Sequence, residues 1–188
     1  MRRSASLSLL VLFAAAPALR AQAPAAPATT ATPAPDVGQL APEFTAEWAD
    51  GTGARATPVK LSELRGHVVV LAFYPKDRTS GCTAEMIKFR DENAKLFGKG
   101  VIVLPVSADS IASHVSWGSE MKFPFALVSD PSLTLADTYG SRMAGRPYAN
   151  RTVFVIGKDG RIAYRELKFN ALNEEAYARL SAAIDAAR

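Results

Sequence analysis

Residues 67–85 read HVVVLAFYPKDRTSGCTAE, and this stretch decides the fold. Its first part, 67–74, is a continuous run of β-branched, apolar and aromatic residues, which is typical of a strand covered on both faces of an α/β sheet. A polar loop follows, and apolar residues then recur at helical spacing from Cys82 to Phe97. The order strand, loop, helix predicts that Cys82 lies at the start of a helix.

The rest of the chain extends this pattern on both sides. A strand, a helix and a second strand at 101–106, 111–121 and 125–129 imply a right-handed crossover and parallel pairing. Asp130 and Pro131 predict the N-cap and the first-turn proline of a helix that runs to Tyr139. The other expected elements are a hairpin formed by 44–48 and 57–61, a short helical turn at 62–66, a hairpin formed by 152–156 and 161–166, and a final helix from about 173 to 187.

The first residues do not belong to this domain. Two arginines precede an apolar stretch from about 7 to 18, and small residues follow, which is the order of a secretory signal peptide. We expect a signal peptide at 1–21, a disordered linker rich in Ala, Pro and Thr at 22–36, and one domain at 37–188. This predicts an exported, periplasmic protein that leaves the membrane once the leader is cleaved; an uncleaved anchor is the alternative.

The overall positive charge comes mainly from the leader. It holds Arg2, Arg3 and Arg20 and no acidic residue. Of the 22 basic residues of the chain, 19 therefore remain after cleavage, against 18 acidic ones. A nearly neutral domain argues against nucleic acid or an anionic membrane as a partner. The sequence also has no Cys/His cluster of the metal-binding type and no glycine-rich phosphate loop.

Cys82 is the only cysteine of the chain, so it cannot close an internal disulfide. At a helix start, the macrodipole and unpaired N–H groups favour the reactive thiolate. Thr79 or Ser80 would cap this helix, and the charged run 76–78 is interpreted as a solvated loop face. His67 and His114 have no matching ligands nearby and are interpreted as structural.

The spacing Pro75-x-x-x-Thr79-x-x-Cys82, within Phe73-Tyr74-Pro75-Lys76-Asp77, resembles the active-site pattern of the peroxiredoxins, in particular the Q-type group that includes the bacterioferritin comigratory proteins. Further matches are 106–110, 123–125, 129–131, 139–140 and 151–156, so the resemblance covers 37 to the C-terminus. It implies an α/β, thioredoxin-like fold with an N-terminal β-hairpin and a central mixed sheet flanked by helices. It also implies reduction of hydrogen peroxide and organic hydroperoxides by a cysteine thiolate, without a metal or an organic cofactor, for antioxidant defence.

The same resemblance implies a role for each of five residues. Cys82 would attack the peroxide, and Arg151 would stabilise the thiolate, because an arginine keeps its charge and does not compete for the proton. Thr79 would orient the peroxide through its hydroxyl. Pro75 would wall the pocket, and Glu85 would hold the arginine in orientation.

One departure from the group changes the expected cycle. Many Q-type members have a resolving cysteine five residues after the reactive one, where this chain has Ile87; Ser80 also replaces a common proline. The sulfenic acid formed on Cys82 therefore needs an external thiol, either a thioredoxin-like protein or a small thiol, and we expect it to be sensitive to over-oxidation. Q-type relatives further imply a monomer or homodimer.

Two other classes of function compete with a peroxidase. A thiol-disulfide oxidoreductase would need a C-x-x-C pair, and Thr83-Ala84-Glu85 follow Cys82 instead. A non-catalytic thioredoxin-fold binding module with a vestigial cysteine stays open on the sequence alone. Convergence of Thr79, Cys82 and Arg151 in space would favour the enzyme.

Overall fold

The computed structural model describes residues 33–188, so the predicted leader and most of the predicted linker lie outside the described residues. The elements are, in chain order, β1 (Thr45–Asp50), β2 (Gly53–Ala54), β3 (Val59–Lys60), the 3-10 turn η1 (Leu61–Leu64), β4 (Val68–Phe73), α1 (Ser80–Asp91), α2 (Asn93–Leu96), β5 (Val101–Ser107), α3 (Ile111–Met121), β6 (Leu127–Ser129), α4 (Thr134–Thr138), β7 (Thr152–Ile156), β8 (Ile162–Glu166) and α5 (Glu174–Ala186).

The strands form one mixed sheet in the order β2-β1-β6-β5-β4-β7-β8. The central pairs β4–β5 and β5–β6 are parallel, as the crossover pattern predicts, whereas β7 and β8 add antiparallel strands beside β4. The N-terminal hairpin is also present, because β1 pairs antiparallel with β2 and β3. The expected fold class, a thioredoxin-like α/β fold with an N-terminal hairpin, is confirmed.

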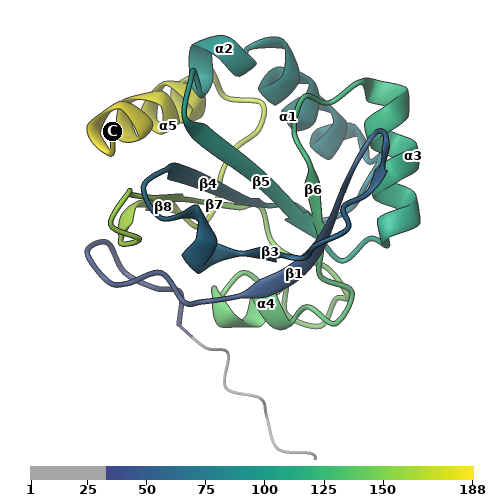
Figure 1. The fold of residues 1–188 in the computed structure, drawn as a ribbon, viewed down its shortest axis with the longest axis horizontal. Coiled ribbons are helices and arrows are strands. Elements are labelled where there is room, and N and C mark those ends of the chain that lie inside the picture. The colour runs from purple at the N-terminus through teal and green to yellow at the C-terminus, as the bar shows by residue number, and fades with distance from the viewer. Residues whose placement is uncertain (1–32) are drawn as a thin grey trace, which may run out of the picture. The chain divides into compact units, whose positions relative to one another are not determined.

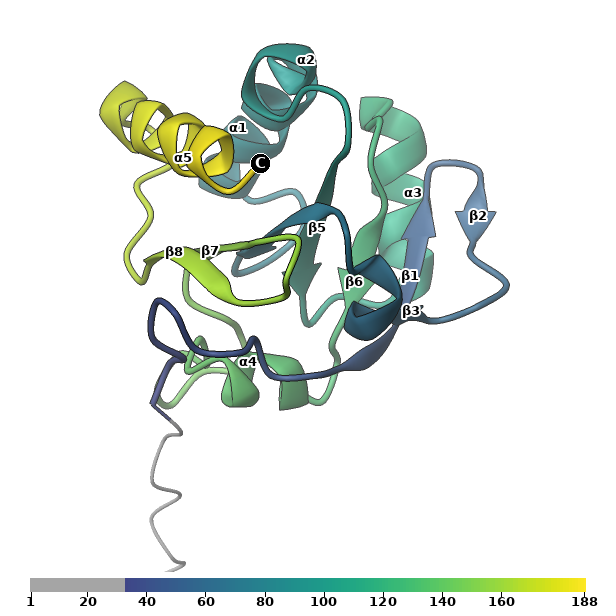
Figure 2. The same ribbon diagram turned by 60° about the vertical axis from the view of Figure 1, so that its left-hand side comes forward.

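Helices cover both faces of the sheet (Figure 1). On one face, α1, α2, α3 and α5 pack on alternate residues of β4 and β7, such as Val70 and Val153. The opposite face packs α4 and the N-terminal segment against the intervening residues, such as Leu71 and Phe154. Turning the molecule shows the sheet between these two layers (Figure 2). All six residues of β4 are buried, which agrees with its uninterrupted apolar sequence.

The sequence prediction of one helix from Cys82 to Phe97 is wrong in two respects. The helix begins earlier, at Ser80, and it breaks at Glu92, whose backbone angles (φ −103°, ψ 17°) are not helical. The carbonyl of Glu92 then accepts the N–H groups of Lys95 and Leu96 as α2 begins. This break turns Leu96 and its neighbour Phe97 into the core, where both are buried.

The predicted start of the helix after β6 is also wrong. Asp130 and Pro131 lie in a turn, Leu133 adopts a left-handed conformation (φ 59°), and α4 begins only at Thr134. The backbone of Asp130 is held at the end of β5, because its N–H donates to the Ser107 carbonyl. Its carboxylate still caps the helix from outside by accepting the N–H of Ala136.

Among residues 33–188, no helix combines the length and the hydropathy that a membrane span requires.

Candidate active site

Strand register brings together parts of the chain that are far apart in sequence. Phe73, the last residue of β4, pairs with Thr152, the first residue of β7. Arg151 therefore lies beside the point where the chain leaves β4 and enters the loop to α1. The carboxyl ends of the parallel strands β4 and β5 share this edge, which is where α/β folds gather ligand-binding groups.

Cys82 is the third residue of α1, and its side chain is fully buried. Thr79 occupies the N-cap position, and its carbonyl accepts the N–H of Thr83. The sulfur therefore lies in the first helical turn, where N–H groups without helical partners and the positive end of the dipole stabilise a negative charge.

Arg151 connects the cysteine to a buried carboxylate. Its Nη2 lies 3.4 Å from Sγ of Cys82, and its Nη1 forms an ion pair with Oε2 of Glu85, one helical turn further along α1. The Arg151 side chain is 18% exposed and that of Glu85 is fully buried. Gly81 permits this close approach, because a Cβ at that position would lie 3.3 Å from Nη2 of Arg151. The structure therefore brings Cys82, Arg151 and Glu85 together.

The charges of this group depend on burial and on each other. Burial raises the pKa of Glu85 to about 7, against the opposite effect of Arg151. Burial disfavours the charge on Arg151, but Glu85 and Cys82 raise the pKa of the guanidinium above its usual value. Arg151 is thus a permanent cation that faces the sulfur and a carboxylate at the same time.

The raised pKa of Glu85 predicts a pH-dependent stability. In the folded protein Glu85 takes up its proton near pH 7, whereas the reference value is 4.5, so the folded state binds more protons between these two values. The free energy of unfolding should therefore fall by ~3 kcal/mol as the pH rises through this window, and stay level above it. Glu85→Gln should lack this fall, which urea unfolding of the full chain at pH 4.5 and pH 7.5 measures.

Glu63→Gln is the matched control, because Glu63 is exposed and pairs with the exposed Lys60. Its free energy of unfolding should change with pH as that of the wild type does, since an exposed ion pair contributes little to stability. A Glu85→Gln variant whose free energy of unfolding fell with pH as in the wild type would contradict the assignment of this pH dependence to Glu85.

The Thr79 hydroxyl makes a different hydrogen bond from the helix cap that the sequence predicts. Its side chain makes no helix-capping bond; its hydroxyl instead donates to the carbonyl of Lys76, at 3.1 Å. The single hydroxyl proton is therefore not directed at the Cys82 sulfur, and the lone pairs of the oxygen remain available to accept a bond. Thr79 is exposed, so it can meet a substrate from solvent.

The loop between β4 and α1 contains a further departure from the prediction. Pro75 is half-buried there, and Lys76 and Arg78 are exposed, but Asp77 is only 6% exposed. The interpretation of 76–78 as a solvated face is therefore wrong for Asp77, because His114, Ser113 and Tyr74 surround its carboxylate with hydrogen bonds. No local sequence signal could have found these partners, since two of them lie on α3.

A hollow of about 420 Å³ opens beside Arg151. The β8–α5 connection forms one wall, including Phe169 and the exposed side chains of Leu167 and Leu172; Gly81 and Arg151 lie on the other side. The sequence analysis did not assign this connection to the site, although two leucines in a predicted loop were a usable signal of an apolar surface. Within the part of the chain that the structure describes, no group of three His, Cys, Asp or Glu residues is arranged to hold a metal ion.

Comparison with known proteins identifies the class of this site. The AhpC/TSA family pattern matches residues 37–165. The chain is 39% identical to a Bcp peroxiredoxin of Coxiella burnetii over 68% of this chain and 85% of that one, and 33% identical to peroxiredoxin Bcp of Bacillus subtilis over 68% and 82%. Its fold matches peroxidoxin BcpB of Mycobacterium tuberculosis with a TM-score of 0.67 at 29% identity, over 82% of this chain and 99% of that one.

The chain belongs to the AhpC/TSA family, and its thioredoxin-like fold with a buried helix-start cysteine beside an arginine is consistent with a cysteine-based peroxidase. Within that family it is a peroxiredoxin of the Q/Bcp group. It is therefore a thiol-dependent peroxidase. Its single cysteine fits a member of this group that lacks the resolving thiol.

Proposed function

We propose that the Cys82 thiolate attacks the terminal oxygen of a hydroperoxide. A sulfur–oxygen bond forms as the oxygen–oxygen bond breaks, so sulfur is oxidised to a sulfenic acid and the peroxide is reduced. The departing oxygen takes up a proton and leaves as water from hydrogen peroxide or as an alcohol from an organic hydroperoxide. Neither a metal nor a cofactor takes part in this step.

The observation that carries the proposal is the contact of Arg151 Nη2 with Sγ of Cys82 at the first turn of α1. Negative charge moves from sulfur to the departing oxygen during attack. A fixed guanidinium and helix-start N–H groups beside both atoms stabilise this charge without reorganisation, which is the largest contribution in many enzymes. Glu85 holds the guanidinium in place through its ion pair.

We assign the orientation of the peroxide to Thr79. Because its own proton is donated to Lys76, its oxygen is left to accept the peroxide hydroxyl proton as a hydrogen bond. This bond would leave the attacked oxygen directed towards Cys82. Pro75, which has no N–H, would form the wall that limits water around the thiolate.

The second half of the cycle requires an external thiol. The position of the usual resolving cysteine is taken by Ile87, half-buried on α1, and the chain has no other cysteine. The thiolate of a thioredoxin-like protein or of a small thiol would attack the sulfenic acid, releasing water and forming a mixed disulfide. A second thiol would then release Cys82 as a thiol and leave with the first as a disulfide.

Graded peroxide added to the reduced full chain tests this reaction. One equivalent should be consumed per chain, with a mass increase of one oxygen on the Cys82 peptide. Without a resolving thiol, excess peroxide should then convert the sulfenic form to sulfinic acid. Mass spectrometry of that peptide measures both steps. No consumption would refute the function, and a stable sulfenic form at large excess would refute only the predicted over-oxidation.

We also propose that residues 1–21 direct export and that the mature protein works in the periplasm. The support is the order of charged, apolar and small residues in the sequence. N-terminal sequencing of the protein recovered from the periplasm should give a start near Gln22. Intact Met1 in a membrane fraction would contradict cleavage.

The assembly is proposed to be a monomer or a homodimer. Among the described residues, the large exposed apolar side chains are Val37, Leu40, Leu167 and Leu172, which lie in two separate places rather than in a broad apolar face. Sedimentation velocity of the reduced protein tests this, and a larger ring would contradict it.

A further inference from the structure

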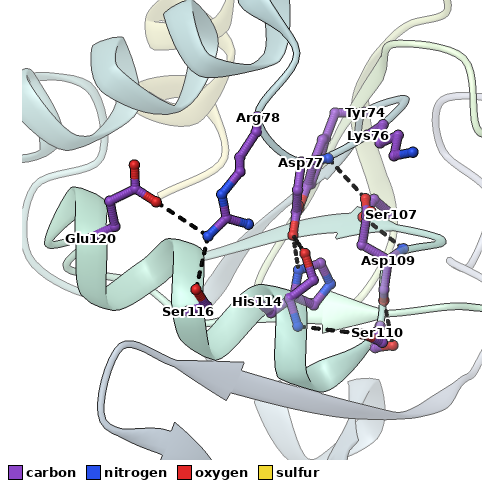
Figure 3. Close-up of polar contacts among 12 residues, drawn as sticks. Tyr74, Lys76, Asp77, Arg78, Ser107, Asp109, Ser110, His114, Ser116 and Glu120 are labelled. Atoms are coloured by element: carbon purple, nitrogen blue, oxygen red, sulfur yellow. Dashed lines mark hydrogen bonds and ion pairs between the residues drawn. The ribbon is translucent and has the colours of Figure 1, made fainter.

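A polar cluster around Asp77 joins the loop between β4 and α1 to α3 (Figure 3). At its centre is the carboxylate of Asp77. Oδ1 accepts the Tyr74 hydroxyl at 2.7 Å, and Oδ2 accepts the Ser113 hydroxyl at 2.6 Å and faces Nδ1 of His114 at 3.1 Å. Burial alone would raise the pKa of Asp77, but the hydrogen bond and charge interaction with His114, and the hydrogen bonds from Ser113 and Tyr74, hold it below its usual value, so the group is a carboxylate.

His114 uses only one of its two ring nitrogens in this cluster. The ring is fully buried, and Nε2 has no hydrogen-bond partner among the residues that the structure describes. Because an ionised carboxylate can only accept, the proton of this contact belongs to Nδ1, which donates it to Asp77.

The peptide group between Lys76 and Asp77 links this cluster to the active site. Its N–H donates to Oδ2 of Asp109 at 2.8 Å, and the same oxygen also accepts the hydroxyl of Ser107. Its carbonyl accepts the hydroxyl of Thr79 at 3.1 Å. The N–H and C=O of a planar trans peptide point in opposite directions, so a peptide held at its N–H by Asp109 presents its carbonyl in a fixed direction.

We propose that His114 and Ser113, through the carboxylate of Asp77, and Asp109, through the Asp77 N–H, are positioning residues that fix the hydroxyl orientation of Thr79 for peroxide binding. The inference rests on the proposed role of Thr79. None of the three touches the substrate. They hold the Lys76–Asp77 peptide, the peptide holds the Thr79 proton, and the Thr79 oxygen is left with only acceptor capacity.

A second set of contacts fixes the direction in which the loop leaves this peptide. Arg78 has a left-handed backbone conformation (φ 62°), which is uncommon for a residue other than glycine. Its guanidinium donates to Ser116 and pairs with Glu120, both on α3. The same helix therefore holds Asp77 and Arg78, the two residues before Thr79.

The two ring nitrogens of His114 allow a sharp comparison of variants. Asparagine places its amide nitrogen at the same number of bonds from the backbone as Nδ1, so His114→Asn keeps the donor to Asp77. It loses Cε1 and Nε2 and puts an amide oxygen in place of Cδ2; Nε2 has no hydrogen-bond partner among residues 33–188. His114→Leu keeps the bulk and loses the donor. We expect His114→Leu to slow sulfenic acid formation by about 10-fold or more, because misorientation near reacting atoms is costly, and His114→Asn to restore most of the rate.

The deciding experiment is a double-mutant cycle with Thr79→Val, read as the second-order rate constant of peroxide reduction in single turnover. If His114 acts through Thr79, His114→Leu should slow the wild type but have little further effect on Thr79→Val. Full additivity would overturn the inference.

Alkylation of Cys82 by iodoacetamide uses the thiolate without the peroxide, so its rate should change by less than about threefold in a folded variant, well short of the loss in peroxide rate. An equal loss in both reactions would assign His114 a merely structural role.

Ser113→Ala provides the same cycle if His114→Leu does not fold. Ser113 is half-buried on α3, and alanine is favoured in helices, so this variant removes one donor to Asp77 without a large defect. Ser119→Ala, at an exposed position of the same helix, is the matched control and should keep the wild-type rate.

Wild-type protein that consumes no peroxide would refute the proposed function itself, whereas an active wild type with additive losses would refute only this inference. An unaffected Thr79→Val variant would likewise overturn the inference and leave the peroxidase function intact.

Discussion

Cys82→Ser is expected to reduce peroxide consumption in single turnover from one equivalent per chain to the level of the buffer. The serine hydroxyl is a poor nucleophile, and its oxygen has no counterpart to the sulfenic acid state. Because the chain has one cysteine, no other thiol can replace it. Residual peroxide, measured after rapid mixing with the reduced protein, gives the result directly.

The controls for this variant must separate lost chemistry from lost folding. Cys82 is fully buried, so a serine there puts a more polar group into the core, at a cost of about 1–3 kcal/mol if it finds no hydrogen bond. Cys82→Ala removes the thiol without adding a polar group. Both variants should be inactive while their circular dichroism matches the wild type. A folded Cys82→Ala protein that still consumed one equivalent would place the reaction elsewhere.

The central part of this site could be predicted because its signals are local. A buried-strand sequence, a turn and a helical pattern place Cys82 at a helix start, and the structure has it in the first turn of α1. Arg151 is 69 residues away from Cys82, and only the resemblance to a family pointed to it. The physical reason for their contact is the register of β4 with β7, which single-sequence patterns do not specify.

The sequence could not predict the cluster around Asp77 for a related reason. A run of three charged residues is normally solvated, and two of those here are exposed. Asp77 departs from this because a crossover brings α3 against the loop, placing His114, 37 residues later, beside its carboxylate. The prediction for the Thr79 hydroxyl is wrong for the same reason. Helix capping is the usual local role of a hydroxyl at this position, but this one donates to the Lys76 carbonyl.

Arg151→Met is expected to lower the rate constant for sulfenic acid formation by about 10²–10³, the range found when a fixed donor to a developing charge is removed. Methionine keeps much of the side-chain length but loses the cation 3.4 Å from Sγ of Cys82. Arg151→Lys should lose less, about 10-fold or more, because an ammonium keeps the charge but cannot reproduce the planar fork that contacts sulfur and Glu85 together. Stopped-flow peroxide reduction of the reduced variants measures both.

Loss of this arginine also leaves the Glu85 side chain buried without its hydrogen-bonding partner, so a slow Arg151→Met variant could reflect a disturbed fold. The double variant Arg151→Met/Glu85→Gln separates the two effects, because an amide at position 85 cannot ionise and needs no cationic partner. It should recover stability in urea unfolding and remain as slow as Arg151→Met. Arg161→Met, which removes a half-exposed arginine paired with Asp159, is the matched control and should keep the wild-type rate. If the double variant recovered its rate together with its stability, Arg151 would act by neutralising Glu85 and not by stabilising the thiolate and the departing oxygen.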